Sequence, residues 1–397
     1  MSISLLWGNR MEHHEQAALA QKLLKHVENG TTDLSVTPYE QPVIEYVCPD
    51  FARKENDLFF ESRPLCVGAS PTIKETGSYM THDLTGKPLL LTRNTKGNFQ
   101  AFLNVCRHRG ARVAEGKGKK NTFSCPYHGW TYDVDGKLVS RPENECFSRQ
   151  CQTESSLRSI PSVEKDGLLW VVPQPSKSIT TLEKQLGELS AELSAYNFAE
   201  FHHYKTETLR PKINWKLSVD TFLESYHFSV LHKTSINPIF YRSQTFDTFG
   251  LNFRLVSPRK TISNIRGIPE KQLDLLPHIV GIYFLFPNSF VIWQLDHLEL
   301  WEIYPSPNNP GESLAQMSFF TPDPVISEQE KDHWDKNLEL VMHVVENEDF
   351  PLGEGIQNGF NSRAQENLTF GTSEPALSFF HESIRNEIEN SIMPSHE

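Results

Sequence analysis

Four features are scarce in this 397-residue sequence: cysteine, long apolar runs, net positive charge and glycine-rich nucleotide-binding motifs. Six cysteines are too few for a disulfide scaffold. The longest apolar run, at 279–286, is far shorter than the ~20 residues that span a bilayer. The first ten residues also lack the pattern of a signal peptide. These absences predict a cytoplasmic protein, in a reducing compartment, that has no membrane-spanning segment.

The charge balance argues against nucleic acid as a partner. Lys and Arg number 38 against 50 Asp and Glu, which gives a formal net charge of −12. Binding to a phosphate backbone needs a basic field, and this chain has an acidic one. The sequence also has no Gly-X-Gly-X-X-Gly motif, so any electrons from NAD(P)H would have to arrive through a separate protein.

The spacing of apolar residues changes twice along the chain, from helical to strand-like and then to a mixture, which predicts an α+β protein. Apolar residues at helical spacing predict an N-terminal helix over 11–28, closed by Asn29-Gly30. From about 45 to 172, short β-branched and aromatic runs alternate with turns, including hairpins at 88–105 and 130–139. A helix at 181–195, strands at 282–286 and 289–295, and a helix at 327–347 follow. The expected parts are therefore a helical segment (1–44), an all-β domain (45–172), a linker and helix (173–200) and an α+β domain on an antiparallel sheet (201–397).

Only two cysteines have histidines at a spacing that indicates metal binding. Cys106-Arg-His108 is followed, after sixteen residues, by Cys125-Pro-Tyr-His128. In a Rieske centre two cysteines hold one iron and two histidines hold the other, so each short cluster can reach both irons. The alternative is tetrahedral zinc, but zinc motifs usually pair cysteine with cysteine and histidine with histidine. The mixed halves therefore favour the iron–sulfur cluster.

A second group of ligand-type residues lies between Asn214 and His232. Asp220, Glu224 and His227 follow one another at spacings of four and three, which would place them on one face if the stretch is helical. His232 comes five residues after His227. Two imidazoles and one carboxylate leave open positions on a ferrous ion, where dioxygen and a substrate can approach.

Together the two motifs resemble the α subunit of the Rieske non-haem iron oxygenases, the aromatic-ring-hydroxylating family, over about 45–365. The flanking Gly110, Pro126, Gly129 and Trp130 belong to that resemblance. It implies a [2Fe-2S] Rieske cluster on the four cysteine and histidine residues. It also implies mononuclear Fe(II) on the two histidines of the second motif.

The resemblance further implies roles for three carboxylates. Glu224 would link the iron site of one subunit to a cluster histidine of its neighbour, although many members have aspartate there; Asp220 is the next candidate. The third iron ligand would be Asp349, which precedes Gln357 by eight positions in an acidic segment. Glu346 and Glu348 compete for that role. His202, His203, His297 and His343 have no partners at ligand spacing, and no chemistry is assigned to them.

The two motifs together predict reductive oxygen activation, and the resemblance implies an oligomer, a trimer or a multiple of three. Electrons would pass from NAD(P)H through a flavin reductase, a ferredoxin or both. A basic group around the first site would be a docking patch for such a partner or simply a solvated loop: Arg107, Arg109, Arg112, Lys117, Lys119 and Lys120.

The first interpretation is hydroxylation or dihydroxylation of a small aromatic substrate by O2. The alternative is N-demethylation or hydroxylation of a quaternary amine by a monooxygenase, since glutamate at position 224 resembles the family members that oxidise such amines. An electron-transfer Rieske protein without oxygenase activity is the alternative from another class, but it would have no use for the second motif. A zinc-stabilised interaction module would have no use for it either.

Overall fold

The computed structural model describes residues 11–147 and 155–392, and the chain forms two compact units. The larger unit contains the described residues up to Leu58, together with Glu183–Asn197 and those from Phe201 onward. The smaller unit contains Phe59–Leu182 and Phe198–Glu200. Among the described residues, no helix combines the length and the apolar character needed to cross a membrane.

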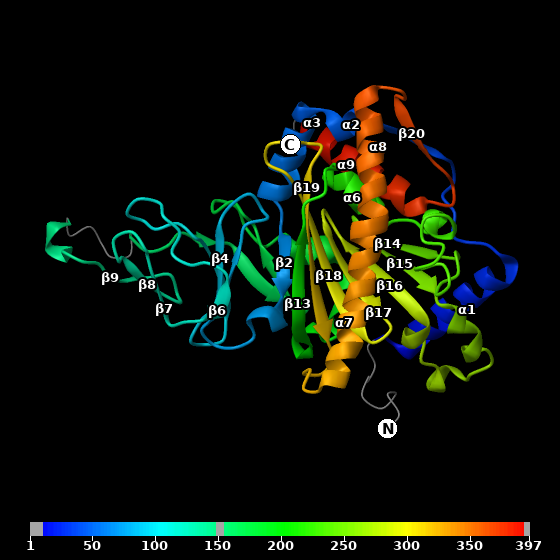
Figure 1. The fold of residues 1–397 in the computed structure, drawn as a ribbon, viewed down its shortest axis with the longest axis horizontal. Coiled ribbons are helices and arrows are strands. Elements are labelled where there is room, and N and C mark those ends of the chain that lie inside the picture. The colour runs from blue at the N-terminus through cyan, green and yellow to red at the C-terminus, as the bar shows by residue number, and fades with distance from the viewer. Residues whose placement is uncertain (1–10, 148–154, 393–397) are drawn as a thin grey trace. The chain divides into compact units, whose positions relative to one another are not determined.

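The smaller unit is built from three antiparallel sheets (Figure 1). The two predicted hairpins are present: β4 pairs with β5, and β8 pairs with β9. The strand orders are β10-β5-β4-β3-β6, β11-β12-β2 and β7-β8-β9. The strands are β2 (Leu65–Ala69), β3 (Ser78–His82), β4 (Leu89–Arg93), β5 (Phe99–Leu103), β6 (Lys117–Lys119), β7 (Thr122–Ser124), β8 (Thr131–Asp133), β9 (Leu138–Ser140), β10 (Ser159–Ile160), β11 (Ser162–Lys165) and β12 (Leu168–Val171).

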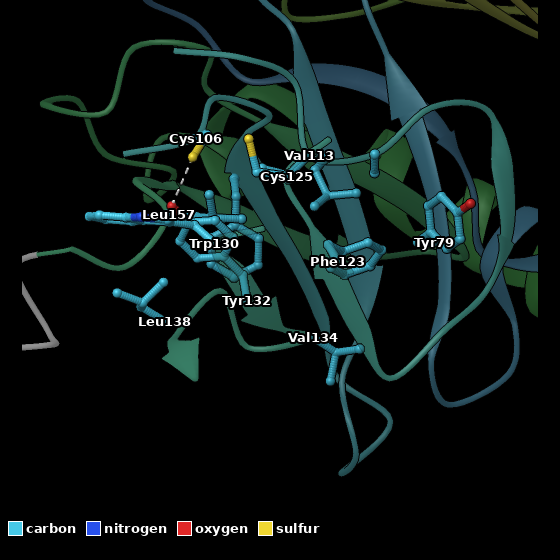
Figure 2. Close-up of a cluster of buried hydrophobic side chains, with 13 residues drawn as sticks. Tyr79, Cys106, Val113, Phe123, Cys125, Trp130, Tyr132, Val134, Leu138 and Leu157 are labelled. Atoms are coloured by element: carbon cyan, nitrogen blue, oxygen red, sulfur yellow. Dashed lines mark hydrogen bonds between the residues drawn. The ribbon is translucent and has the colours of Figure 1, made fainter. Parts of the chain in front are cut away.

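A buried cluster of aromatic and aliphatic side chains supports the β7-β8-β9 sheet and the loops beside it. Tyr79 packs edge-on against Phe123, and Tyr132 is fully buried. Figure 2 shows Cys106 and Cys125 within this cluster, with a hydrogen bond between the Cys106 sulfur and the Tyr132 hydroxyl. The core of the sheet therefore extends directly to the two cysteines.

One seven-stranded antiparallel sheet dominates the larger unit, in the order β13-β19-β18-β17-β16-β15-β14. Its register sets residues from four strands in rows, and one row aligns Ser257, Val280, Gln294 and His297. Because side chains alternate between the two faces, every second residue of these strands faces the same side. The strands are β13 (His202–Leu209), β14 (Thr245–Phe249), β15 (Asn252–Pro258), β16 (Ile279–Leu285), β17 (Ser289–Gln294), β18 (His297–Pro305) and β19 (Ser313–Thr321).

Helices cover this sheet, and α7 and α8 run in line across it in the view of Figure 1. A short π-helix, η10 (Val344–Asp349), joins these two helices. A two-stranded ribbon, β1 (Tyr39–Pro42) with β20 (Asn367–Phe370), ties distant parts of the chain together. The helices of this unit are α1 (His13–Asn29), α2 (Ile44–Val47), α3 (Pro49–Glu55), α5 (Leu189–Ala195), α6 (Trp215–Asp220), α7 (Glu328–His343), α8 (Phe350–Ser362) and α9 (Pro375–Ile392).

Two predictions for the first half of the chain were wrong in detail. Residues 44–61 are largely helical rather than β, through α2, α3 and the π-helix η2 (Asn56–Glu61), so the strands of the smaller unit start with β2 at Leu65. Pro49 lies in the first turn of α3, where its missing N–H leaves no hydrogen bond unmade. The single helix expected over 181–195 is two helices, α4 (Leu182–Leu186) and α5, separated at Gly187, whose φ is +53°.

The second motif is not one helix, which was the condition for placing Asp220, Glu224 and His227 on one face. Helix α6 ends at Asp220, and a 3-10 turn, η6 (Tyr226–Ser229), carries the first histidine. The Glu224 carboxylate accepts hydrogen bonds from the backbone N–H groups of Tyr226 and His227. A side chain that takes over backbone donors in this way competes with helix continuation, which explains the break.

Candidate metal centres

Two loops of the smaller unit present the first set of predicted ligands, and both have the same backbone hydrogen bonds. The Cys106 N–H donates to Ala111 O (2.8 Å), and the Gly110 N–H donates to Cys106 O (3.0 Å). The Cys125 N–H donates to Trp130 O (2.8 Å), and the Gly129 N–H donates to Cys125 O (3.0 Å). Each loop thus closes on itself around its cysteine.

Both loops need a glycine at the same place. Gly110 and Gly129 each lie four residues after the cysteine and have φ of +82° and +70°. This left-handed conformation costs an L-residue free energy but costs glycine none. The histidine stands two residues after the cysteine in the first loop and three in the second, so the same turn presents the two imidazoles from different positions.

The four side chains form two pairs. Cys106 and Cys125 are buried, whereas the rings of His108 and His128 are half-buried and lie 4.6 Å apart between centroids. The His108 ring stacks on Trp130, and its Nδ1 is buried without a hydrogen-bond partner. An imidazole nitrogen that is buried and unpaired suits a metal ligand.

The electrostatics also favour neutral imidazole at this site. Burial, with help from His128 and Arg109, lowers the pKa of His108 below its ordinary value. Burial raises the pKa of the Cys106 thiol, while the hydrogen bond with Tyr132 acts in the opposite direction. Metal binding needs neutral imidazole and thiolate, so the lowered pKa of His108 favours the form that a metal binds.

The arrangement does not suit a single tetrahedral ion. Within the described residues, the one group of three or more His, Cys, Asp or Glu side chains close enough to share an ion lies elsewhere, in the larger unit. A structural zinc site would bring all four ligand atoms around one point. Separate cysteine and histidine pairs fit a centre with two irons, so the residues present fit the Rieske cluster.

The basic group around these loops is partly neutralised. Arg112 pairs with Asp83 and Lys119 pairs with Glu75, both at 2.6 Å. The Arg109 guanidinium lies over the exposed Tyr127 ring at 5.2 Å. The surface beside the histidines is therefore aromatic as well as basic.

His227, His232 and Asp349 meet in the larger unit, although 117 positions (349 − 232) separate the last two in sequence. The Nε2 atoms of the two histidines are 3.1 Å apart. Asp349 Oδ1 lies 3.1 Å from His232 Nε2 and 3.7 Å from His227 Nε2. Neighbouring ligand atoms of an octahedral ion with bonds of about 2.1 Å are separated by about 3 Å, so these three atoms can occupy one face of it.

Buried polar contacts fix the elements that carry this triad. Asn214 caps α6, its Oδ1 accepting from the Lys216 N–H at 2.9 Å, and its own N–H donates to Gln357 Oε1 of α8 at 2.9 Å. Lys216 is fully buried and pairs with Glu55 at 2.5 Å. The segment before the histidines and the helix after Asp349 are thereby held together.

A carboxylate holds each imidazole by its other ring nitrogen. Glu224 contacts His227 Nδ1, and Glu348 Oε2 lies 2.6 Å from His232 Nδ1 while accepting from Ser235 Oγ at 2.7 Å. Such contacts turn Nε2 towards a metal and fix the tautomer. Glu348, predicted as a competing ligand, therefore lies behind His232, and Glu346 is exposed to solvent.

The local charges favour a cation at the triad. Burial lowers the pKa of His232, but Asp349 and Glu348 outweigh it and raise the pKa above its ordinary value. The same carboxylates would stabilise a bound metal ion.

The two carboxylates predicted to bridge subunits have different surroundings. Both oxygens of Asp220 are engaged: Oδ2 accepts from the Tyr46 hydroxyl at 2.8 Å, and Oδ1 lies 2.9 Å from His381 Nε2. Glu224 contacts His227 directly and lines an open pocket of the larger unit together with Leu352 and Ile356. Of the two, Glu224 is in contact with a triad histidine.

A cavity of about 150 Å³ adjoins the triad on the side of the sheet. Its lining is mostly apolar, with Phe222, Phe228, Ile282 and Trp301 among the residues that contribute. The Phe222 ring packs against Phe290 at 4.9 Å and against Trp301 at 5.2 Å. The cavity is large enough for a small organic molecule.

The sequence analysis missed the acidic group of this cavity. Glu299 is 3% exposed, accepts from Trp301 Nε1 at 2.9 Å and lies 3.4 Å from His297 Nε2. His297, to which no chemistry was assigned, lies between Glu299 and Asp296. Strand alternation alone puts His297, Glu299 and Trp301 on one face, but only the fold shows that this face lines a cavity beside the triad.

Comparison with known protein families matches both units. The family described as "Rieske [2Fe-2S] domain" matches residues 63–163, and "Ring hydroxylating alpha subunit (catalytic domain)" matches 198–390. The two matches follow each other in the order that the two motifs predict.

Two relatives of known name cover most of the chain. The carnitine monooxygenase oxygenase subunit of Escherichia coli is 25% identical over 350 residues, which cover 83% of this chain and 88% of that protein. The chloroplastic choline monooxygenase of Atriplex hortensis is 26% identical over 326 residues, covering 80% and 71%. Among solved structures, a quaternary ammonium Rieske monooxygenase in complex with L-carnitine has a TM-score of 0.75 and 19% identity, covering 89% of this chain and 96% of that one. This structural likeness shows the same fold.

Proposed function

Because this chain belongs to the Rieske oxygenases as a catalytic α subunit, we propose that it is a monooxygenase of a quaternary amine. As an oxygenase of this kind, it uses a [2Fe-2S] cluster, a mononuclear iron and electrons from NAD(P)H delivered through a reductase. The aromatic substrate that was our first interpretation gives way to the alternative, since the relatives named above act on carnitine and choline.

The proposed ligands of the cluster are Cys106, Cys125, His108 and His128. The proposed ligands of the mononuclear iron are a second set, which comes from three different segments of the larger unit: His227, His232 and Asp349. Bound there, the iron supplies reductive activation of dioxygen. The chain's own contribution is to hold these side chains and to place a substrate beside them.

The observation that carries the proposed substrate is the buried Glu299 in an otherwise apolar and aromatic cavity. A quaternary ammonium group has no N–H to donate, so a site recognises it through opposite charge and the faces of aromatic rings. Trp301 and Phe222 supply such rings beside Glu299. An aromatic hydrocarbon would gain nothing from a buried carboxylate, whose desolvation is costly.

The acidic end of the cavity stays negative even when histidine is charged. His297 lies between Asp296 and Glu299, so protonation of this one ring still leaves a net negative charge on the three groups. Burial lowers the pKa of His297, and the two carboxylates together raise it above its ordinary value. A substrate cation therefore meets a favourable field at this end.

The overall reaction consumes one O2, two electrons and two protons. One oxygen atom enters a C–H bond next to the cationic nitrogen, and the other leaves as water. The C–N bond of the hydroxylated carbon then breaks with its electron pair on nitrogen while the hydroxyl group loses its proton, which gives a neutral tertiary amine, an aldehyde and one proton. Glu224 and Glu348 keep the two imidazoles oriented during turnover, and the apolar lining keeps bulk water away from the reacting carbon.

We propose that electrons enter at the second, open pocket beside the triad. Glu224, His227 and Asp349 line it, and the exposed side chains of Leu352 and Ile356 give it an apolar rim. This rim suits the loops of a second subunit, whose cluster histidine would reach Glu224. The proposed partners are accordingly a second copy of the chain, and a reductase or ferredoxin.

The test is a single-turnover experiment that needs no cognate reductase. Full-length protein with both centres loaded is reduced chemically, desalted and mixed with O2 and either a quaternary amine or a monocyclic aromatic hydrocarbon. We expect a C–N cleavage product from carnitine, γ-butyrobetaine or choline, measured by mass spectrometry. Oxidation of the hydrocarbon with every quaternary amine left intact would refute the proposed substrate class.

A matched substitution tests the role of Glu299. Glu299→Gln keeps the size and the Trp301 hydrogen bond but removes the charge. Choline and its uncharged carbon isostere, 3,3-dimethylbutanol, are compared by calorimetric titration. We expect the variant to weaken choline binding roughly 10-fold or more and to leave the isostere unchanged. Equal effects on both ligands would remove Glu299 from recognition of the cation.

A further inference from the structure

The same cavity also has a basic end, which the proposed function does not yet use. Arg259 follows the last residue of β15 and lines the cavity together with Gln244, Ser257 and Gln294. Its guanidinium lies over the Phe240 ring at 5.0 Å, and its backbone bridges to Phe240. These contacts hold a cationic side chain against the wall of a largely apolar cavity.

Arg259 has no carboxylate within ion-pair distance in the described part of the chain. Its Nη1 donates a hydrogen bond to Gln294 Oε1 at 3.1 Å. Asp296, the carboxylate whose charge acts on Arg259, has Oδ1 3.0 Å from His297 Nδ1 and Oδ2 2.9 Å from His333 Nε2. Burial lowers the pKa of Arg259, with Asp296 opposing it, so the site gains from an anion placed there.

The donors at this end are suited to a carboxylate. Because Gln294 Oε1 accepts from Arg259, its amide nitrogen remains to donate, and Ser257 stands in the same row of the sheet. Arginine presents a planar fork that matches a carboxylate, and the amide and the hydroxyl add neutral donors beside it.

The register of the sheet gives the spacing between the row of Gln294, which the Arg259 guanidinium reaches at 3.1 Å, and the row of Glu299. Gln294 pairs with His297. The next row whose side chains face the same side of the sheet pairs Ile292 with Glu299. Adjacent rows on one face are two residues apart, which corresponds to about 7 Å. Three carbon atoms between a nitrogen and a carboxylate span about 5 Å. The two charged ends of the cavity therefore match the two charges of a short betaine.

The order of the two ends along the cavity also places the ammonium group of a bound betaine nearer the triad than its carboxylate. Phe222, which packs on Trp301, comes two residues before Glu224 and five before His227. Arg259 lies beyond the Gln294 row, at the opposite end of the strands from Trp301. A betaine bound with its carboxylate at Arg259 would direct its N-methyl end towards the histidines.

We infer that Arg259, with Gln294, anchors the carboxylate of a zwitterionic substrate, so that the enzyme selects quaternary amines that carry an acid group. This inference rests on the proposed function and narrows it. It distinguishes carnitine-like betaines from choline, although proteins named for each compound are relatives of this chain.

The experiment compares γ-butyrobetaine with its methyl ester by calorimetric titration of the full-length oxidised protein. The two ligands share the ammonium group and differ in the negative charge. We expect the wild-type protein to bind the acid at least 10-fold more tightly. Arg259→Gln should weaken binding of the acid roughly 10- to 100-fold and change binding of the ester less than about 3-fold. Arg259→Lys should recover part of the preference, because it restores the charge without the fork.

Two further variants keep the test decisive. Gln294→Glu places a carboxylate against Arg259 and should cause the same selective loss, even if Arg259→Gln fails to fold. Arg266→Gln, an exposed arginine that pairs with Glu28, should leave both dissociation constants unchanged.

Failure of this inference differs from failure of the proposed function. If the wild-type protein binds acid and ester equally, or if Arg259→Gln weakens both equally, the carboxylate anchor is overturned while the quaternary-amine proposal stands. If neither quaternary amine binds, the proposed function fails, and the inference fails with it.

Discussion

The two candidate metal centres are built in opposite ways. In the smaller unit each loop closes by backbone hydrogen bonds around its own cysteine, and a left-handed glycine completes the turn. In the larger unit the ligands come from a 3-10 turn, a loop and a π-helix, and side-chain carboxylates orient them. The first site thus depends on backbone conformation within short segments, and the second depends on side chains brought together by the fold.

This difference explains what could be predicted. Cys106, His108, Cys125 and His128 could be proposed as ligands from their spacing alone, because a self-contained loop carries its geometry in its sequence. Asp349 could be selected only by resemblance. Its neighbours Glu346 and Glu348 have similar chemistry, and the π-helix decides which of the three faces the histidines.

The remaining errors have the same origin. The helical spacing of Asp220, Glu224 and His227 suggested one continuous face, but Glu224 bonds to the backbone and ends the regular structure. Glu299 and Arg259 could not be recognised as cavity residues from the sequence. Whether a strand residue lines the cavity depends on which face of the sheet borders the triad. The positions of strands could be predicted from short stretches of sequence. The cavity could not, because the register between strands determines which side chains line it.

The largest expected effect is the loss of the first centre alone. Cys106→Ala or His128→Ala should abolish the visible spectrum of the cluster and all NADH-coupled turnover, since the loop offers no replacement ligand. Mononuclear iron should remain at about one per chain, because the second site belongs to a separate unit. Visible spectra and metal analysis measure both quantities. A full cluster spectrum in both variants would contradict the assignment.

Substitutions at the second centre should separate a ligand from the carboxylate behind it. Asp349→Ala should lose the mononuclear iron and activity while keeping the cluster spectrum. Glu348→Gln, which still contacts His232, should lower iron affinity only about 10-fold. Glu346→Ala is the exposed control and should behave as the wild-type protein. Equal iron loss in Glu348→Gln and Asp349→Ala would mean that Glu348 is itself a ligand.

A third substitution tests the connection between the two centres. Glu224→Gln keeps a hydrogen-bond acceptor but removes the charge beside His227. We expect both centres to stay loaded and reducible, while transfer of electrons from the cluster slows roughly 100-fold. Rapid mixing of reduced protein with O2 and substrate would record this as a cluster that stays reduced. Reoxidation at the wild-type rate would place the electron path elsewhere, with Asp220 the residue to substitute next.

The smallest expected effect concerns the backbone, and it uses the same substitution in both units. Gly110→Ala puts an L-residue at φ +82° in a loop where its Cβ would meet no atom within 4 Å. Because the new methyl group has space, the cost is conformational and should be about 1 kcal/mol of local stability. Gly355→Ala lies within α8, has equally open surroundings and lacks a positive φ, so it should stabilise that helix by up to ~1 kcal/mol.

Thermal unfolding measures the sign of each change in stability. It is followed through the cluster spectrum for the smaller unit and through far-ultraviolet circular dichroism for the larger unit. Opposite signs are expected because the loop needs its glycine for a left-handed turn, while the helix beside the triad only tolerates one. A stabilising Gly110→Ala would mean that the first centre is not held by its backbone turns.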